Sequence, residues 1–247
     1  MANQLMFDNG KGTVLVTGAG RGIGQATAKA LAIAGYPLLL VSKTAHSLHE
    51  THHLCALHVP TQSVILDVRD EGQVAQIQQT LGDLPMLHAV VNNAGVGQWS
   101  TIDQTSLEAW NAQLDTNLRG PFLIIRETLP YFRRQGHGLY VNVGSDSSLV
   151  GMPRRAAYNA SKFGLVGLTA SLRAEVGGEG IHACMIYAGK TDTYFREHSP
   201  GDRLGALSAA DVATVIAFVI QQYPHLIIGE VSVFPPGDGL TGTRSFL

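Results

Sequence analysis

Tyr158 and Lys162 lie four positions apart, and Ser145 precedes Tyr158 by thirteen residues. Side chains four residues apart share one face of a helix, so the phenol and the ammonium could act at one point. An unperturbed phenol has a pKa of about 10 and is a poor acid or base at neutral pH. A neighbouring cation favours the phenolate, and we therefore expect Lys162 to lower the pKa of Tyr158 toward the range useful for proton transfer. On its own such a pair is usually an ordinary part of a helix surface, so the rest of the chain must support the interpretation.

A glycine-rich segment near the start of the chain could bind a dinucleotide. Residues 17–24 read TGAGRGIG, between the apolar run 13–16 and the alanine- and leucine-rich stretch 23–34. The first run is typical of a buried strand, and Gly35 is a suitable end for a helix over the second. Glycines let the backbone approach a pyrophosphate, which the free N–H groups of a helix N-terminus bind. In this order of strand, turn and helix, the segment predicts a dinucleotide site.

Composition and charge restrict the class of protein. The chain has 247 residues and a formal net charge of −2. With its signs interspersed it has no basic stripe, so we expect no nucleic-acid partner. Cys55 and Cys184 lack a C-x-x-C spacing, which indicates neither a disulfide framework nor a zinc site. No signal peptide is evident, and no apolar stretch reaches the ~18 residues that a membrane span needs. We therefore expect one catalytic domain over residues 1–247, in the cytoplasm and not in a membrane.

Apolar runs of strand length alternate with longer helical patterns. Strands are expected at 13–16, 38–41, 63–66, 87–91, 139–143, 181–186 and 230–234, and helices at 23–34, 71–81, 107–134, 156–176 and 209–222. Pro121 and Pro130 are expected to break or kink the long central helix, because proline removes a backbone donor. Strands that are apolar on both faces and separated by helices indicate a parallel sheet covered on both sides. The sequence thus predicts an α/β fold with a doubly wound (Rossmann), mostly parallel, seven-stranded sheet.

Five ordered motifs resemble the short-chain dehydrogenase/reductase family, and the match covers nearly the whole chain. They are the glycine segment 17–24, Asp67-Val68, Asn92-Asn93-Ala94-Gly95, Asn117 within 116–120, and Ser145 together with Tyr158 and Lys162. The resemblance implies a reductase that transfers hydride from a nicotinamide to a carbonyl group. Tyr158 would then donate the proton, and Ser145 would bind the same substrate oxygen, where negative charge develops. Lys162 would hold Tyr158 and the nicotinamide ribose, and Asn117 would hold a water that links Lys162 to solvent.

The resemblance also implies which residues hold the cofactor. Besides Tyr158 and Lys162 they are Gly18, Gly20, Arg21, Gly22, Ile23, Gly24, Ser42, Lys43, Asp67, Val68, Asn93, Ala94, Gly95, Gly189, Thr191 and Thr193. An acid at the end of the second strand would bind the ribose 2′-OH and repel a 2′-phosphate. This chain has Ser42 there, followed by Lys43, and Arg21 projects from the glycine turn. Two cations and a hydroxyl suit a 2′-phosphate, so we expect NADP(H), although a merely solvated lysine and arginine would give the same pattern.

The chain departs from the family pattern after the sixth strand, where Ala188 replaces the usual proline and Cys184 a common asparagine. The expected substrate-pocket residues are largely apolar or aromatic: Val96, Trp99, Met152, Tyr187, Tyr194 and Phe195. Such a lining favours an apolar or aromatic ketone or aldehyde. Arg154 and Arg155 could meet an anionic substrate or could simply be solvated. The short segment 190–208, with few apolar residues, predicts a small lid.

Two other functions stay open at this point. One is a non-catalytic NADP-binding sensor or scaffold, although such proteins typically lose the tyrosine or the lysine. The other is an NAD-dependent alcohol dehydrogenase, which Ser42 and Lys43 disfavour. A third possibility, a metal site on the face shared by His46, His49 and His53, lacks a complete ligand set. The helix at 156–176 has apolar residues on more than one face, which predicts a homodimer or homotetramer.

Overall fold

The computed structural model describes residues 11–84, 86–195 and 199–236. Its main sheet has seven strands in the order β3-β2-β1-β4-β5-β6-β9, and every pairing is parallel. The strands are β1 (Thr13–Thr17), β2 (Leu38–Ser42), β3 (Thr61–Ile65), β4 (Leu87–Asn92), β5 (Gly138–Ser145), β6 (Ile181–Ala188) and β9 (Glu230–Val233). The prediction of a doubly wound, seven-stranded parallel sheet is confirmed.

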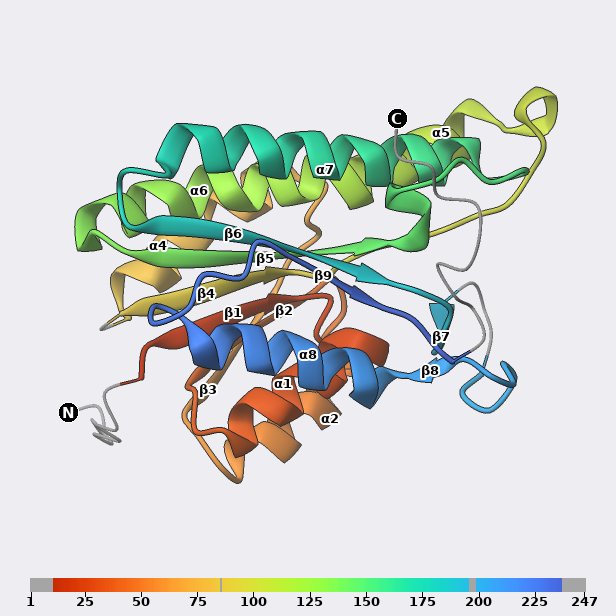
Figure 1. The fold of residues 1–247 in the computed structure, drawn as a ribbon. Coiled ribbons are helices and arrows are strands. Elements are labelled where there is room, and N and C mark those ends of the chain that lie inside the picture. The colour runs from red at the N-terminus through yellow and green to blue at the C-terminus, as the bar shows by residue number, and fades with distance from the viewer. Residues whose placement is uncertain (1–10, 85, 196–198, 237–247) are drawn as a thin grey trace.

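Helices cover both faces of this sheet (Figure 1). One layer contains α1 (Gly22–Ile33), α2 (Ala45–Ala56) and α8 (Ala209–Gln222), and the other contains α3 (Glu71–Ala75), α4 (Ile77–Gly82), α5 (Leu107–Leu114), α6 (Gly120–Gln135) and α7 (Ala156–Val176). The strands alternate between the two layers, since Val14 and Val16 pack on one side of β1 and Leu15 on the other. Burial on both faces explains the continuous apolar runs in the sequence. None of the helices in the described ranges combines the length and apolar character of a membrane span.

The long central helix is interrupted, but not by its prolines. Between α5 and α6, residues Asp115–Arg119 form a π-helical turn, in which the Gly120 N–H donates to the Asp115 carbonyl. Pro121 lies in the first turn of α6, where no backbone donor is needed, and Pro130 lies inside α6 without ending it. Single π turns within helices are frequent at functional sites, and this one carries Asn117. The expected helix at 71–81 is likewise divided into α3 and α4.

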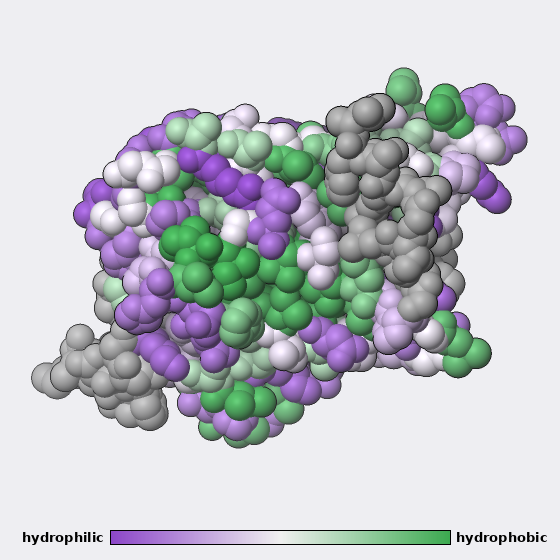
Figure 2. Space-filling view, in the orientation of Figure 1, coloured by the Kyte–Doolittle hydropathy of each residue, from purple (hydrophilic) through white to green (hydrophobic). Residues whose placement is uncertain are grey.

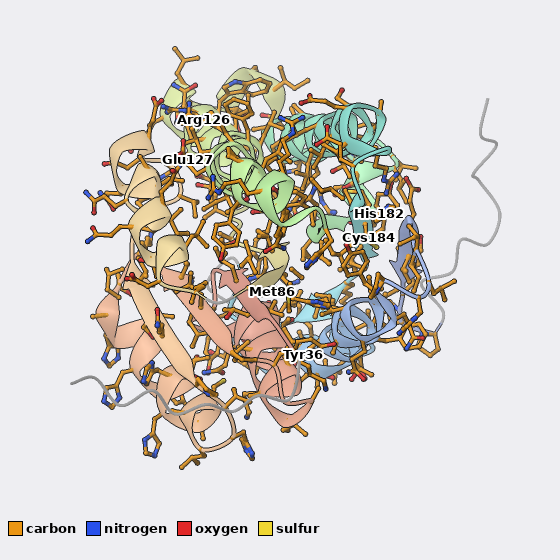
Figure 3. All side chains as sticks on the ribbon, turned by 90° about the vertical axis from the view of Figure 1, so that its left-hand side faces the viewer. Tyr36, Met86, Arg126, Glu127, His182 and Cys184 are labelled. Carbon is orange, nitrogen blue, oxygen red and sulfur yellow. The ribbon has the colours of Figure 1, made fainter. Side chains whose placement is uncertain are left out.

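The amino ends of the strands are closed by aromatic side chains. Figure 3 views the molecule from this end, with Tyr36 and His182 among the labelled residues. The ring of His88 lies between Tyr36 and Tyr223, with centroid distances of 5.2 and 5.5 Å, and His182 lies 5.9 Å from Tyr223. The Tyr223 hydroxyl also accepts the Gly138 N–H at 2.8 Å. In open α/β sheets, ligands bind at the opposite end, outside the carboxyl ends of the strands.

Candidate active site

A cavity of about 1030 Å³ opens at the carboxyl ends of the strands. These strand ends lie on the right in Figure 1. Most of the expected site residues line it: Gly18, Gly20, Arg21, Gly22, Ile23, Ser42, Lys43, Asp67, Val68, Asn93, Ala94, Gly95, Ser145, Tyr158, Lys162, Gly189, Thr191 and Thr193. Gly24 and Asn117 do not line the cavity, so any contribution of theirs to the site is made through neighbouring groups. The cavity therefore extends from the glycine turn to Tyr158.

The turn between β1 and α1 is built for close backbone approach. Gly18 has a φ of +65°, and a side chain at Gly24 would collide with the Gly18 carbonyl. Asn93, from the end of β4, donates from Nδ2 to the carbonyl oxygens of Thr17 at 3.0 Å and Gly18 at 3.3 Å. The Asn-Asn-Ala-Gly motif at the end of β4 thus holds the glycine turn in place. The N-cap residue Arg21 makes no side-chain capping bond, so the first N–H groups of α1 remain available to an anion.

The end of β2 carries a cluster of hydroxyl groups beside a lysine. Ser47, in α2, is 2.9 Å from the Ser42 hydroxyl and 2.8 Å from that of Thr44. Lys43 is exposed between them and lines the cavity. Arg69 forms an ion pair with Asp67 at 2.6 Å, and its hydrogen bond is the main reason that the pKa of Asp67 lies below its usual range. This carboxylate pairs with Arg69, whereas none of the ion pairs within residues 11–84, 86–195 and 199–236 involves Lys43.

Arg21 takes a different position from the one expected. Its guanidinium lies 5.8 Å from the ring centroid of Tyr194, in the segment after β7 (Thr191–Asp192). The strand before that segment, β7, pairs with β8 (Leu207–Ser208) in a small second sheet. The Arg21 guanidinium therefore lies at the segment after β7, while Lys43 follows the end of β2.

Ser145, Tyr158 and Lys162 come together at the other end of the cavity. Ser145 is the last residue of β5, and the other two lie in the first two turns of α7, all three being buried. Tyr158 and Ser145 are hydrogen-bonded to each other. The Lys162 ammonium donates to the Val143 carbonyl at 2.8 Å and lies 5.9 Å from the centroid of the Tyr158 ring. The sequence spacing thus brings the three groups together as expected.

The expected lowering of the Tyr158 pKa is wrong for this arrangement. Burial raises the pKa of Tyr158 to about 12, and the interaction with the Ser145 hydroxyl opposes this rise only in part. The charge of Asp146 raises this pKa further, whereas Arg155 and Arg203 lower it. Lys162 is bonded to the backbone and does not offset the effect of burial. The phenol therefore keeps its proton at neutral pH.

Burial disfavours the charged form of Lys162. Burial lowers the pKa of Lys162 to about 8, so the unfolded chain binds this proton more tightly than the folded protein does. Folding stability therefore falls as the pH drops through about 8, and it rises between pH 8 and the ordinary lysine pKa. Without cofactor, we expect Lys162→Met to raise the melting temperature at pH 7 by about 2–6 °C and to flatten its rise toward pH 9.5.

Thermal melts across this pH range test the expectation, with Lys29→Met as the matched control. Lys29 is an exposed residue of α1, so its replacement should leave the pH dependence unchanged. A Lys162→Met protein that melts below wild type at both ends of the range contradicts the assignment of a buried, costly ammonium.

Asn117 binds neighbouring segments of the chain. Its side-chain oxygen accepts the Val96 N–H at 2.8 Å, and its amide nitrogen donates to the Val96 carbonyl at 2.9 Å and to the Ser161 hydroxyl at 3.0 Å. Asn117 is fully buried. The side chain therefore ties the segment after β4 to α7, beside the lysine that it was expected to serve. The role toward a water that the resemblance implies stays a prediction.

The expected substrate residues divide into two groups. Val96, Trp99, Tyr194 and Phe195 line the cavity, whereas Met152 and Tyr187 do not. Tyr187 packs in a small core cluster with Leu165 and Met185, because its position in β6 points it away from the opening. The Met152 sulfur instead contacts the Arg155 guanidinium at 2.8 Å.

Sequence reasoning missed several polar residues of the site. Asp146 accepts the Ser145 hydroxyl proton at 2.6 Å, and Arg203 lines the cavity beside Tyr158. The direct sequence proximity of Asp146 to Ser145 could have drawn attention to it, but nothing marked Arg203. His46, His49 and His53 lie on α2, and no group of His, Cys, Asp or Glu in the described ranges could hold a metal ion.

Known proteins resemble this chain in sequence and in fold. The profile of the family described as short chain dehydrogenase matches residues 12–203. A 2,3-dihydro-2,3-dihydroxybenzoate dehydrogenase of Escherichia coli (strain K12) is 36% identical over 181 residues, which are 73% of this chain and 69% of that protein. An alcohol dehydrogenase from the archaeon Thermococcus sibiricus, solved with 5-hydroxy-NADP, superposes with a TM-score of 0.87 at 26% identity and covers 92% of this chain and 97% of its own.

A metagenomic short-chain oxidoreductase solved with NADP has a TM-score of 0.79 at 27% identity, over 91% of this chain and 96% of its own. The family profile spans well over half of the chain, and its range includes the glycine turn and the Ser145, Tyr158 and Lys162 group. The chain therefore belongs to the short-chain dehydrogenase/reductase family and is an oxidoreductase.

Proposed function

We propose that this oxidoreductase is an NADPH-dependent carbonyl reductase in which Tyr158 donates the proton to a small, apolar or aromatic ketone or aldehyde. One observation carries the proposal. The buried phenol of Tyr158, bonded to Ser145, lies at an aromatic-lined end of the same cavity that contains the glycine turn. A hydride donor bound along the turn and a carbonyl group at the phenol would share that space.

The protonation of Tyr158 supports the direction of the reaction. The nicotinamide supplies the hydride when it is bound, and the carbonyl oxygen becomes negatively charged as the hydride arrives. With its pKa raised to about 12, Tyr158 holds a proton at neutral pH and can give it to the far more basic alkoxide. Ser145 now donates to Asp146, and rotation of its hydroxyl toward the substrate would add a second donor at the same oxygen.

The residues at the end of β2 fit a 2′-phosphate. Ser42, Thr44 and Ser47 offer hydroxyl donors, Lys43 offers a positive charge, and no acid stands in the position that would repel the phosphate. Two solved relatives contain NADP or 5-hydroxy-NADP, which favours the same cofactor here. We therefore assign NADP(H), with the 2′-phosphate held mainly by Lys43 and the hydroxyl cluster.

Oxidation of NADPH followed at 340 nm with a panel of ketones and aldehydes tests the reaction. We expect turnover with apolar and aromatic members of the panel and slower turnover with NADH. Tight NADPH binding without turnover of any compound would indicate a sensor or scaffold instead. Faster oxidation of alcohols with NAD than reduction with NADPH would indicate an alcohol dehydrogenase.

Exposed apolar side chains support the proposal of a homodimer or homotetramer. A groove of about 390 Å³ between α5, α6 and α7 is lined by Leu114, Leu118, Phe122 and Leu168, together with Asp115 and Arg119. Phe122 is 44% exposed and Phe163, on α7, is 45% exposed. A second apolar surface runs over the edge strand β9, between α7 and α8 (Figure 2), where Phe218, Leu226 and Ile227 are exposed. Surfaces of this kind are usually covered by a symmetric partner.

We expect Phe122→Asp to shift the protein toward smaller species in sedimentation or light scattering at micromolar concentration. A carboxylate in the middle of an apolar interface would be buried without a partner, which is strongly unfavourable. Ile33→Asp serves as the control, because Ile33 is 73% exposed on α1 and does not line the groove that contains Phe122. Wild-type protein that sediments as a 26.3 kDa monomer would remove the basis for an oligomer.

A further inference from the structure

Two guanidinium groups border the substrate end of the cavity. Arg155 lies at the N-terminus of α7, and Arg203 lies between β7 and β8, so they approach from separate segments of the chain. Both line the cavity, and the positive charge of each lowers the pKa of Tyr158. Both charges therefore lie within electrostatic reach of the oxygen that would carry the reacting proton.

Arg203 is held by neutral groups. Its Nη1 donates to the Thr191 carbonyl and its Nη2 to the Phe195 carbonyl, each at 3.3 Å. None of the carboxylates in the described ranges forms an ion pair with it. A guanidinium has five N–H donors, so two bonds to backbone leave donors for a ligand. Carbonyl acceptors also leave its charge uncompensated.

Arg155 is compensated only in part. It stacks on the Trp99 ring at 4.8 Å from the centroid, and its Nη1 lies 3.9 Å from the Asp146 carboxylate. That carboxylate is already engaged, because it accepts the Ser145 hydroxyl and the Ser147 N–H, both at 2.6 Å. The Lys162 ammonium lines the same end, so that two arginines and a lysine face one aspartate and positive charge is in excess there.

Aromatic rings form the walls next to this charge. Trp99 packs edge-on against Tyr158 at a centroid distance of 4.9 Å, and Phe195 lies 5.8 Å from Tyr158 and 6.3 Å from Trp99. Flat walls of this kind favour a planar, unsaturated or aromatic ring in the substrate. A guanidinium beside them can bind a carboxylate through two parallel hydrogen bonds.

We infer that the substrate is a ring compound that carries a carboxylate as well as the reacting carbonyl, with the carboxylate bound by Arg203 and supported by Arg155. The inference rests on the proposed reductase function and specifies its substrate class. The excess positive charge suits an anionic group, and the parallel N–H donors of a guanidinium match the two oxygens of a carboxylate. The ring would lie against the aromatic wall that Trp99 and Phe195 form, with its carbonyl oxygen toward Tyr158 and Ser145.

A matched pair of aldehydes tests this inference. The pair is 4-formylbenzoate and its methyl ester, with the 3-formyl pair run in parallel, and the readout is kcat/KM with NADPH for wild type and for Arg203→Gln. We expect wild type to prefer at least one acid over its ester by about tenfold or more, as a charge-assisted hydrogen bond would give. Arg203→Gln should bring that ratio close to one.

Two further variants separate charge from structure. Arg203→Lys keeps the charge and should retain part of the preference, whereas Arg134→Gln removes an exposed charge that does not line the cavity and should change nothing. If Arg203→Gln lowers turnover of acid and ester equally, Arg203 only anchors the loop and the inference is wrong. Equal turnover of acid and ester by wild type in both pairs would also overturn it.

Binding of benzoate and of benzamide to the NADPH-loaded protein distinguishes failure of the inference from failure of the proposed function. Calorimetry that shows Arg203-dependent preference for benzoate, without reduction of any aldehyde, would support the carboxylate site and refute the reductase. Reduction of esters and neutral aldehydes alone would support the reductase and refute the carboxylate site. Neither binding preference nor turnover would refute both.

Discussion

Replacement of Tyr158 by phenylalanine is expected to lower kcat for an accepted ketone or aldehyde by about 10²–10⁴-fold, because it removes the proton that the alkoxide must receive. NADPH affinity should stay nearly unchanged, since the ring and its contacts with Trp99 and Phe195 remain. Single-turnover measurement of NADPH oxidation reports the chemical step directly. Fluorescence titration of the bound nucleotide reports affinity in the same samples.

Tyr131→Phe is the matched control for this variant. Tyr131 lies on α6, and its hydroxyl donates to the Leu84 carbonyl at 2.8 Å, outside the cavity lining. Its loss removes one hydrogen bond and should leave turnover as in wild type. Should Tyr158→Phe reduce the substrate within a few-fold of wild type, another group must supply the proton and the assignment of Tyr158 fails.

Ser42→Asp is expected to reverse the choice of cofactor. A carboxylate at the end of β2 would face the 2′-phosphate of NADPH, and such like-charge contacts cost several kcal/mol. The ratio of kcat/KM for NADPH to that for NADH should fall by ~100-fold or more. Lys43→Ala should lower the same ratio by about tenfold, through loss of one charge-assisted hydrogen bond.

Arg21 provides a comparison within the same cavity. Because its guanidinium lies over the Tyr194 ring, Arg21→Ala should change the cofactor ratio less than Lys43→Ala does. Lys29→Ala, on the exposed side of α1, controls for loss of a positive charge alone. Wild type that prefers NADH, or a ratio that Lys43→Ala leaves unchanged, would show that the hydroxyl cluster does not select the 2′-phosphate.

Much of the fold follows from local sequence signals. The helices expected at 156–176 and 209–222 have the same bounds in the structure. The second begins with a capping box in which Ser208 and Asp211 bond each other's backbone, a pattern that is visible in the sequence. The strand positions also agree with the expected ones to within about two residues at most ends, since a parallel sheet buried on both faces needs continuous apolar runs.

The details of the site could not be predicted in the same way. The partner of Ser145 and the position of Arg203 depend on how loops from distant segments pack, which no periodicity encodes. The π turn at Asp115–Arg119 also escaped prediction, because its residues suit an ordinary helix. For Tyr158, spacing suggested that Lys162 would control the pKa, whereas the degree of burial, a property of the whole fold, controls it instead.

The aromatic closure at the amino ends of the strands has a consequence for how such a protein can diversify. Tyr223 links the start of β5 to the end of α8 by contacts that lie at the opposite end of the sheet from Tyr158 and Arg203. The contacts that stabilise the sheet at its amino end are thus separate from the candidate active site at its carboxyl end. Because distant substitutions tend to act independently, loops such as 199–206 can change in length and composition with little loss of folding stability. New substrates can arise by exchange of these loops on a scaffold whose rigidity is maintained elsewhere.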